Sequence, residues 1–123
     1  MTLIEITLVI AILLSLIAVL FLGVAAYKKG ADRAKCILNI TTVQKTMRSY
    51  ANLNELEEAD ACTTADLAGA GKMLAVVPDC PDGTGTYAFL AVIPPASTSD
   101  ADLYTVCSLA GANDHKPKNA VGW

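Results

Sequence analysis

An uncharged apolar stretch near the N-terminus constrains the fold of this chain more than any other feature. Residues 6–27 contain no charged side chain, and only Thr7, Ser15 and Tyr27 among them carry polar side-chain atoms. A helix rises ~1.5 Å per residue, so this stretch spans about 33 Å and can cross the ~30 Å hydrocarbon core of a bilayer. Glu5 lies at the edge of the stretch. A carboxylate there is costly and indicates a functional position that needs a partner.

The apolar stretch differs from a secretory signal peptide. No basic segment precedes it, it is longer than the ~7–15 apolar residues of a signal peptide, and no small-x-small cleavage signal follows it. Lys28 and Lys29 come directly after it, and in an ordinary anchor they would mark the cytoplasmic end. The four cysteines beyond them favour a head on the non-cytoplasmic side, because disulfides persist in oxidising compartments.

The chain starts with Thr2-Leu3-Ile4-Glu5 after Met1, and an apolar run follows at residues 8–13. These residues resemble the mature N-terminus of bacterial type IV pilins and their pseudopilin relatives, and the resemblance covers roughly the first 50 residues. In that family a leader is removed just before residue 1, and the new N-terminus is methylated. Met1 stands here where the family usually has phenylalanine, and the proline that is common near position 22 is absent.

The resemblance implies a structural subunit rather than an enzyme. It implies a major pilin that polymerises through its N-terminal helix into an extracellular filament on the bacterial surface, after waiting in the inner membrane. Met1 would be the processed and methylated N-terminus, and Glu5 would pair with the amine of the neighbouring subunit during assembly. The expected partners are identical subunits, the pilus assembly machinery and a prepilin peptidase, with no cofactor and no direct contact with nucleic acid.

Two other functions fit the same residues. The chain could be a pseudopilin of a type II secretion or DNA-uptake system, which forms short periplasmic filaments. It could also be a membrane-anchored binding domain that never polymerises, in which case Glu5 would be dispensable.

The sequence predicts an α+β fold. Helical spacing continues beyond the apolar stretch on one face: Cys36, Ile40, Val43, Met47 and Tyr50. We therefore expect residues 1–27 to form a transmembrane and polymerisation helix, and residues 28–123 to form a small head that includes the second half of that helix, about residues 28–53. Thr63 has the pattern of an N-cap for a short helix. Residues 86–93 and 102–109 have the composition of strands and predict an antiparallel hairpin packed on the helix.

The four cysteines predict two disulfides, each contributing roughly 2–4 kcal/mol to a head with a small core. Three pairings are possible. We favour Cys80–Cys107, since Cys80 precedes the first predicted strand and Cys107 lies in the second. That pairing leaves Cys36–Cys62.

The sequence predicts no metal site. It contains neither a C-x-x-C motif nor a local Cys/His cluster, which makes zinc an unexpected ligand. His115 is the only histidine and is interpreted as a solvated side chain in a polar tail. Two aspartate pairs, Asp79 with Asp82 and Asp100 with Asp102, are weighed as calcium ligands and interpreted as solvated turn residues.

Overall fold

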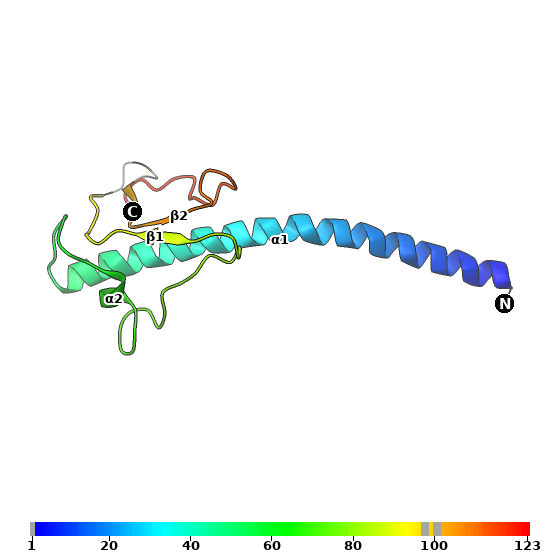
Figure 1. The fold of residues 1–123 in the computed structure, drawn as a ribbon, viewed down its shortest axis with the longest axis horizontal. Helices are drawn as coiled ribbons and strands as arrows, with labels where there is room; N and C mark the ends of the chain where they lie inside the picture. Colours follow the sequence, from blue (N-terminus) through cyan, green and yellow to red (C-terminus); the bar gives the residue numbers. More distant parts are fainter. Residues whose placement is uncertain (1, 97–98, 100–101) are drawn as a thin grey trace. The chain divides into compact units, whose positions relative to one another are not determined.

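The computed structural model describes residues 2–96, 99 and 102–123, and it confirms the α+β class. A long helix comes first, α1 (Leu3–Leu53), and is followed by a single-turn helix, α2 (Thr64–Leu67). Two short strands come next, β1 (Tyr87–Phe89) and β2 (Thr105–Cys107), which lie beside the second half of α1 (Figure 1). The chain divides into two compact units, one reaching Ala31 and the other Asp32–Trp123.

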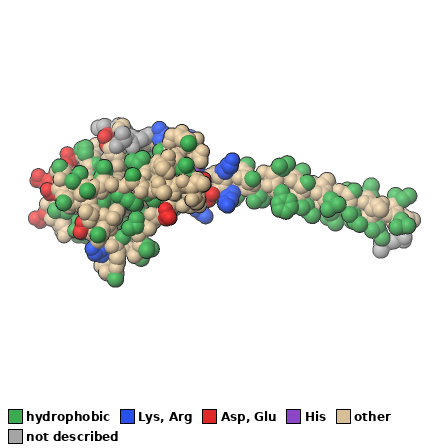
Figure 2. Space-filling model, viewed as in Figure 1, with side chains coloured by type: hydrophobic (Ala, Val, Ile, Leu, Met, Phe, Trp, Pro, Cys, Tyr) green, Lys and Arg blue, Asp and Glu red, His purple; other side chains and the backbone are tan. Residues whose placement is uncertain are grey.

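The first unit is a helix whose apolar side chains are uncovered. The large apolar side chains of residues 3–24 are between 47% and 82% exposed, and Figure 2 shows hydrophobic side chains along this half of α1. The hydroxyls of Thr7 and Ser15 donate to the carbonyls of Ile4 and Ile12, so neither polar group needs water. By length and composition, this helix could cross a membrane.

The second unit is built on one face of α1. The buried residues of that face are Cys36, Ile40, Val43, Gln44, Met47 and Ala51. The predicted stripe is thus confirmed for four residues, while Tyr50 is half-buried and packs at the edge of the core. Gln44 is polar and was not expected there; its Oε1 accepts a hydrogen bond of 3.0 Å from the amide of Tyr104.

The core of this unit comprises two hydrophobic clusters. One cluster lies toward the end of α1 and consists of Val43, Met47, Ala51, Cys62, Leu67, Ile93 and Tyr104. The other lies nearer the start of the unit and consists of Cys36, Ile40, Cys80, Leu103, Cys107 and Ala120. The polar tail is therefore part of the head: Ala120 is buried, and Trp123 packs against the second cluster.

The hairpin is antiparallel, as predicted, but its strands are shorter than expected. Tyr87 pairs with Cys107 and Phe89 with Thr105. Beyond Leu90, the chain exchanges partners: the amide of Cys62 donates to Ala91, and the amide of Ala59 donates to Ile93. The apolar pattern of residues 86–93 is therefore shared between two pairings, and only its first part belongs to the hairpin.

The short helix begins where the sequence predicts. The Asp66 carboxylate accepts hydrogen bonds from the amide and the hydroxyl of Thr63, at 2.8 and 2.7 Å. The helix ends after one turn, and Gly69 follows with a φ of +141° that residues with a side chain rarely adopt.

Candidate functional site

Glu5 lies in the first turn of α1 and is exposed among apolar side chains. Its Oε2 accepts a hydrogen bond of 3.1 Å from the amide of Thr2, at the positive end of the helix dipole. The predicted role of Met1 lies outside the described residues. The predicted pairing of Glu5 with a neighbouring amine stays a prediction, since a single chain has no such neighbour.

The four cysteines are all buried, and no two of their sulfurs lie at disulfide-bonding distance. Cys80 and Cys107, the favoured pair, do lie together, with their Sγ atoms 3.8 Å apart. The other pair is not brought together: Cys36 lies in the cluster of Cys80 and Cys107, whereas Cys62 lies in the other cluster. Cys36 lies on α1 one turn before Ile40, and both residues pack in the cluster that contains Cys107 of the hairpin. Cys36 is therefore near Cys80 and Cys107 rather than near Cys62.

His115 is not a solvated side chain, and this interpretation was wrong. It is only 2% exposed, and its Nδ1 lies 3.8 Å from Sγ of Cys80. The tail folds back after β2, where the amide of His115 donates to the carbonyl of Leu109. Arg33 holds the residue before it, through an ion pair with the Asp114 carboxylate and a bond of 2.9 Å from Nε to the Asp114 carbonyl.

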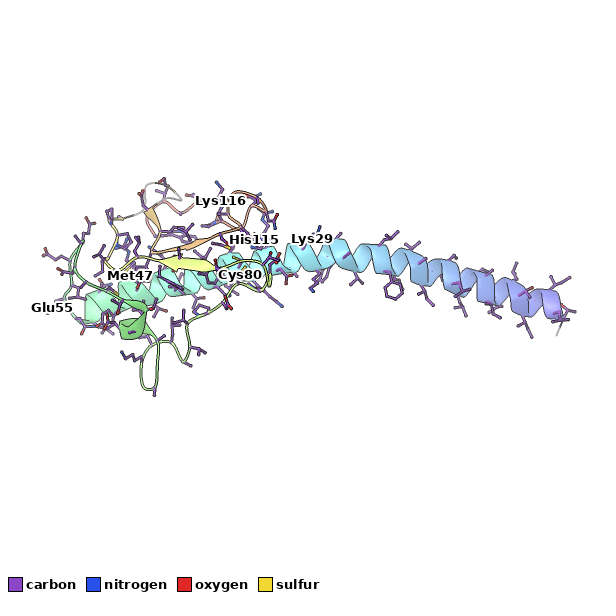
Figure 3. All side chains as sticks on the ribbon, viewed as in Figure 1. Lys29, Met47, Glu55, Cys80, His115 and Lys116 are labelled. Carbon is purple, nitrogen blue, oxygen red and sulfur yellow. The ribbon has the colours of Figure 1, made fainter. Side chains whose placement is uncertain are left out.

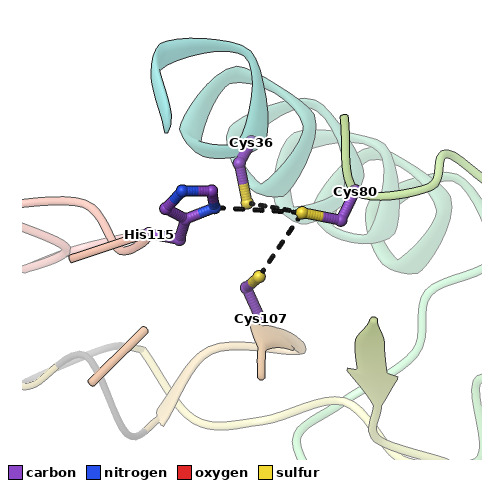
Figure 4. Close-up of side chains that lie close together, drawn as sticks. All are labelled: Cys36, Cys80, Cys107 and His115. Atoms are coloured by element: carbon purple, nitrogen blue, oxygen red, sulfur yellow. Dashed lines mark hydrogen bonds between the residues drawn. The ribbon is translucent and has the colours of Figure 1, made fainter. Parts of the chain in front are cut away.

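Three thiols and one imidazole thus converge at a single point. Sγ of Cys80 lies 4.0 Å from Sγ of Cys36 and 3.8 Å from Sγ of Cys107. The ligand atoms of Cys36, Cys80, Cys107 and His115 all lie within 4.8 Å of one another. We call these four residues the Cys/His cluster. They come from α1, the loop before β1, β2 and the tail, and their side chains face one another (Figure 4).

Polar contacts fix the backbone around the Cys/His cluster. Nδ2 of Asn39 donates to the carbonyl of Asp79, directly before Cys80, at 3.1 Å. The Tyr87 hydroxyl donates to the carbonyl of Cys36 at 3.4 Å. In this way α1 holds the Cys80 loop, and β1 holds the turn of α1 that carries Cys36; Figure 3 shows Cys80 and His115 beside this part of α1.

Burial governs the acidity of the thiols. Loss of hydration raises the pKa of Cys36 to about 12 and also raises the pKa of Cys80 and of Cys62. Such thiols are neutral at pH 7 and are poor nucleophiles. Three sulfurs and one imidazole nitrogen are, however, a donor set for a soft or borderline metal ion, which deprotonates a coordinating thiol.

The aspartates weighed as calcium ligands bind their own turns where the structure describes them. Oδ1 of Asp79 accepts a bond from the amide of Cys80 at 2.9 Å, and Oδ1 of Asp82 accepts bonds from the amide and hydroxyl of Thr84. Asp100 lies outside the described residues.

Sequence reasoning missed the Cys/His cluster because its members are far apart in the chain. Cys36 and Cys80 are separated by 44 residues, Cys80 and Cys107 by 27, and Cys80 and His115 by 35. Short-range ligand motifs do not cover such spacing. The available signals were Cys36 on the buried stripe and the closeness of Cys80 to Cys107.

Comparison with family models, with curated proteins and with solved structures found no match to this chain.

Proposed function

We propose that this chain is a filament-forming subunit of the type IV pilin kind, which polymerises through the first half of α1. The observation that carries the proposal is the exposure of that half: its large apolar side chains are at least 47% exposed over residues 3–24. A helix that is apolar all round needs to be buried.

The free energy of burying these apolar side chains strongly favours an apolar environment over water. Burying a Leu, Ile or Val side chain contributes about 1.5–3 kcal/mol. Lipid supplies this environment for a waiting subunit, and the same helix of other subunits supplies it in a polymer. The hydrophobic contribution is similar in both, so apolar burial alone does not drive release from the membrane or fix the axial position of one helix against another.

Glu5 supplies the specificity that apolar packing lacks. A carboxylate in a medium of low dielectric constant costs several kcal/mol unless a positive group and hydrogen-bond donors compensate it. The amide of Thr2 is one such donor. In the proposed polymer, the N-terminal amine of a neighbouring subunit provides the positive charge, and this pairing sets the register between subunits.

The head of the proposed subunit is the unit Asp32–Trp123. Its core lies within residues 32–123, so we expect it to fold without a membrane. We place it on the non-cytoplasmic side before assembly and on the filament surface afterwards. The role is structural, not enzymatic.

Replacement of Glu5 tests the proposal. Cells producing the wild-type chain, Glu5→Ala or the control Glu57→Ala are examined by negative-stain electron microscopy, and the chain is quantified in the membrane fraction. Glu57 is an exposed acid of the head. We expect filaments from the wild type and the control, and a membrane-retained Glu5→Ala chain without filaments.

Two outcomes contradict parts of the proposal separately. Unchanged filaments from Glu5→Ala would remove the register role of the carboxylate. Absence of filaments from the wild type, with the chain present in the membrane, would favour an anchored domain that does not polymerise.

A further inference from the structure

We infer that Cys36, Cys80, Cys107 and His115 together bind one zinc ion in a closed, structural site of the head. The inference is independent of polymerisation, because all four residues belong to the unit Asp32–Trp123. It rests on the spacing of the ligand atoms, their burial and the way the surrounding residues hold them.

The spacing of the sulfurs matches a tetrahedral metal site better than a disulfide. Two tetrahedral Zn–S bonds of about 2.3 Å place their sulfurs about 3.8 Å apart, whereas a disulfide joins its sulfurs at about 2.05 Å. In the structure, Sγ of Cys80 lies 3.8 Å from Sγ of Cys107, 4.0 Å from Sγ of Cys36 and 3.8 Å from Nδ1 of His115. Cys80 therefore lies at nearly equal distance from three other donors, as one corner of a tetrahedron does.

The donor set itself favours zinc. Three thiolates and one imidazole form a known structural zinc ligand set, and softer ligands discriminate against calcium and magnesium. When the ion enters, three S–Zn bonds form, the three thiol protons leave to solvent, and His115 binds through a neutral ring nitrogen.

Burial makes the site closed. The exposed fractions are 0% for Cys36, 7% for Cys80 and 2% each for Cys107 and His115. Four protein ligands complete a tetrahedral shell and leave no position for substrate or reactive water. The geometry therefore points to a structural ion rather than a catalytic one.

A single disulfide satisfies this arrangement poorly. Any bond between two of the three thiols would leave the third buried beside His115, with only a weak thiol–imidazole hydrogen bond to compensate both groups. Cys62 does not complete a second bridge, because it lies in the other hydrophobic cluster, where its carbonyl accepts a bond of 2.9 Å from the Tyr104 hydroxyl.

The surroundings orient the ligands as metal sites require. Arg33 fixes Asp114, directly before His115, and Asn39 fixes Asp79, directly before Cys80. His115 and Thr105 line the same cavity of about 40 Å³, and Thr105 Oγ1 is buried without a partner among the described residues. That volume accommodates a water molecule, which would serve both Thr105 and the second ring nitrogen of His115.

The zinc ion would act as a cross-link within the head. It joins α1, the loop before β1, strand β2 and the tail in a head with a small core. Small domains commonly need such a cross-link, and metal binding energy becomes folding energy when the unfolded chain lacks the site.

Metal analysis of the full chain tests the inference. The wild type, Cys80→Ser, His115→Ala and the control Cys62→Ser are purified in detergent without chelators or metal-affinity resins. Zinc, iron and copper are then quantified by mass spectrometry. We expect one zinc per chain in the wild type and in Cys62→Ser, and at least a roughly tenfold loss in the two ligand variants. Cys62 is a matched control because it is also a buried cysteine.

Two further measurements keep the inference falsifiable if a ligand variant fails to fold. X-ray absorption of the wild type should give three sulfurs at about 2.3 Å and one nitrogen at about 2.0–2.1 Å around zinc. The variant His115→Cys should retain zinc and change this shell to four sulfurs.

Other results would overturn the inference. A wild-type chain that binds no zinc after anaerobic reduction and zinc addition contradicts it, as does a mapped disulfide within the Cys/His cluster in such a chain. Equal zinc loss from Cys62→Ser and Cys80→Ser would remove the site from these residues. Iron or copper in place of zinc would refute the metal assignment.

Discussion

Gly85 has the tightest surroundings of any glycine in the chain. A Cβ atom on Gly85 would lie 2.5 Å from Sγ of Cys80 and 2.9 Å from Cδ1 of Leu109. The backbone of the turn before β1 thus presses directly on a member of the Cys/His cluster. No other residue type leaves the sulfur of Cys80 in its place.

We predict that Gly85→Ala destabilises the head by about 1–3 kcal/mol, the usual cost of overpacking a core. It should also weaken zinc binding, because the added methyl group displaces Cys80. Urea unfolding and a zinc competition titration measure the two effects.

Gly83→Ala is the matched control, since nothing lies within 4 Å of a Cβ at that position and no positive φ is needed there. If Gly85→Ala and Gly83→Ala unfold at the same urea concentration, the close contact between Gly85 and Cys80 does not affect the free energy of unfolding.

The cysteines show what residue-level reasoning can and cannot predict. The antiparallel pairing of the two predicted strands was enough to bring Cys80 and Cys107 together, and their sulfurs lie 3.8 Å apart. The predicted Cys36–Cys62 pair was obtained by elimination, and elimination fails when three cysteines share one site. His115 depends on the path of an irregular tail, for which no periodic pattern exists.

At the level of elements, helix α2 depends on the carboxylate at its N-terminus. Hydrogen bonds from the backbone and side chain of Thr63 lower the pKa of Asp66 below its ordinary value of 3.8. A lowered folded-state pKa means that the ionised form stabilises the fold. This contribution is complete above the unfolded pKa and is lost as the pH falls through the lower folded pKa.

We therefore predict that Asp66→Asn destabilises α2 at neutral pH and that the difference from the wild type disappears in acid. Stability measured by urea unfolding between neutral pH and about pH 2 should show the two curves converging as the pH falls below the ordinary Asp pKa. Glu57→Gln serves as the exposed-acid control. A difference that persists unchanged into acid would mean that Asp66 acts through its shape and not its charge.

The long periodic helix was predictable, whereas the two short strands were predicted in their pairing but not in their length. Residues 36–47 of α1 repeat at helical spacing, and the structure buries the predicted face. Residues 86–93 look like one strand because apolar character does not specify a partner. The hydrogen bonds show that Tyr87–Phe89 pairs with β2, whereas Ala91 and Ile93 accept bonds from residues 62 and 59.

At the scale of the whole molecule, the two units differ in whether their apolar side chains are buried within the chain itself. Both hydrophobic clusters of the head draw only on residues 36–123, including Trp123 at the edge of one. The apolar side chains of residues 3–24 contribute to neither. The head should therefore fold without them.

We predict that a chain of residues 28–123 is soluble without detergent, monomeric and folded, and that it no longer enters filaments. Size-exclusion chromatography with light scattering measures its mass, and amide hydrogen exchange measures protection of Val43 and Met47. The full chain in detergent is the reference. Aggregation of the shortened chain, or loss of protection at these buried positions, would mean that the first half of α1 is required for the head to fold.

The order of the ligands along the chain has a consequence for biosynthesis. Among the four residues, Cys36 comes first in the chain and His115 last. In the proposed topology, the inferred zinc shell would therefore be complete only once almost the entire head had crossed the membrane. A chain truncated or stalled before residue 115 keeps three thiols exposed to oxidation. Metal binding would thus distinguish finished subunits from unfinished ones, and only the finished ones would be protected from disulfide exchange.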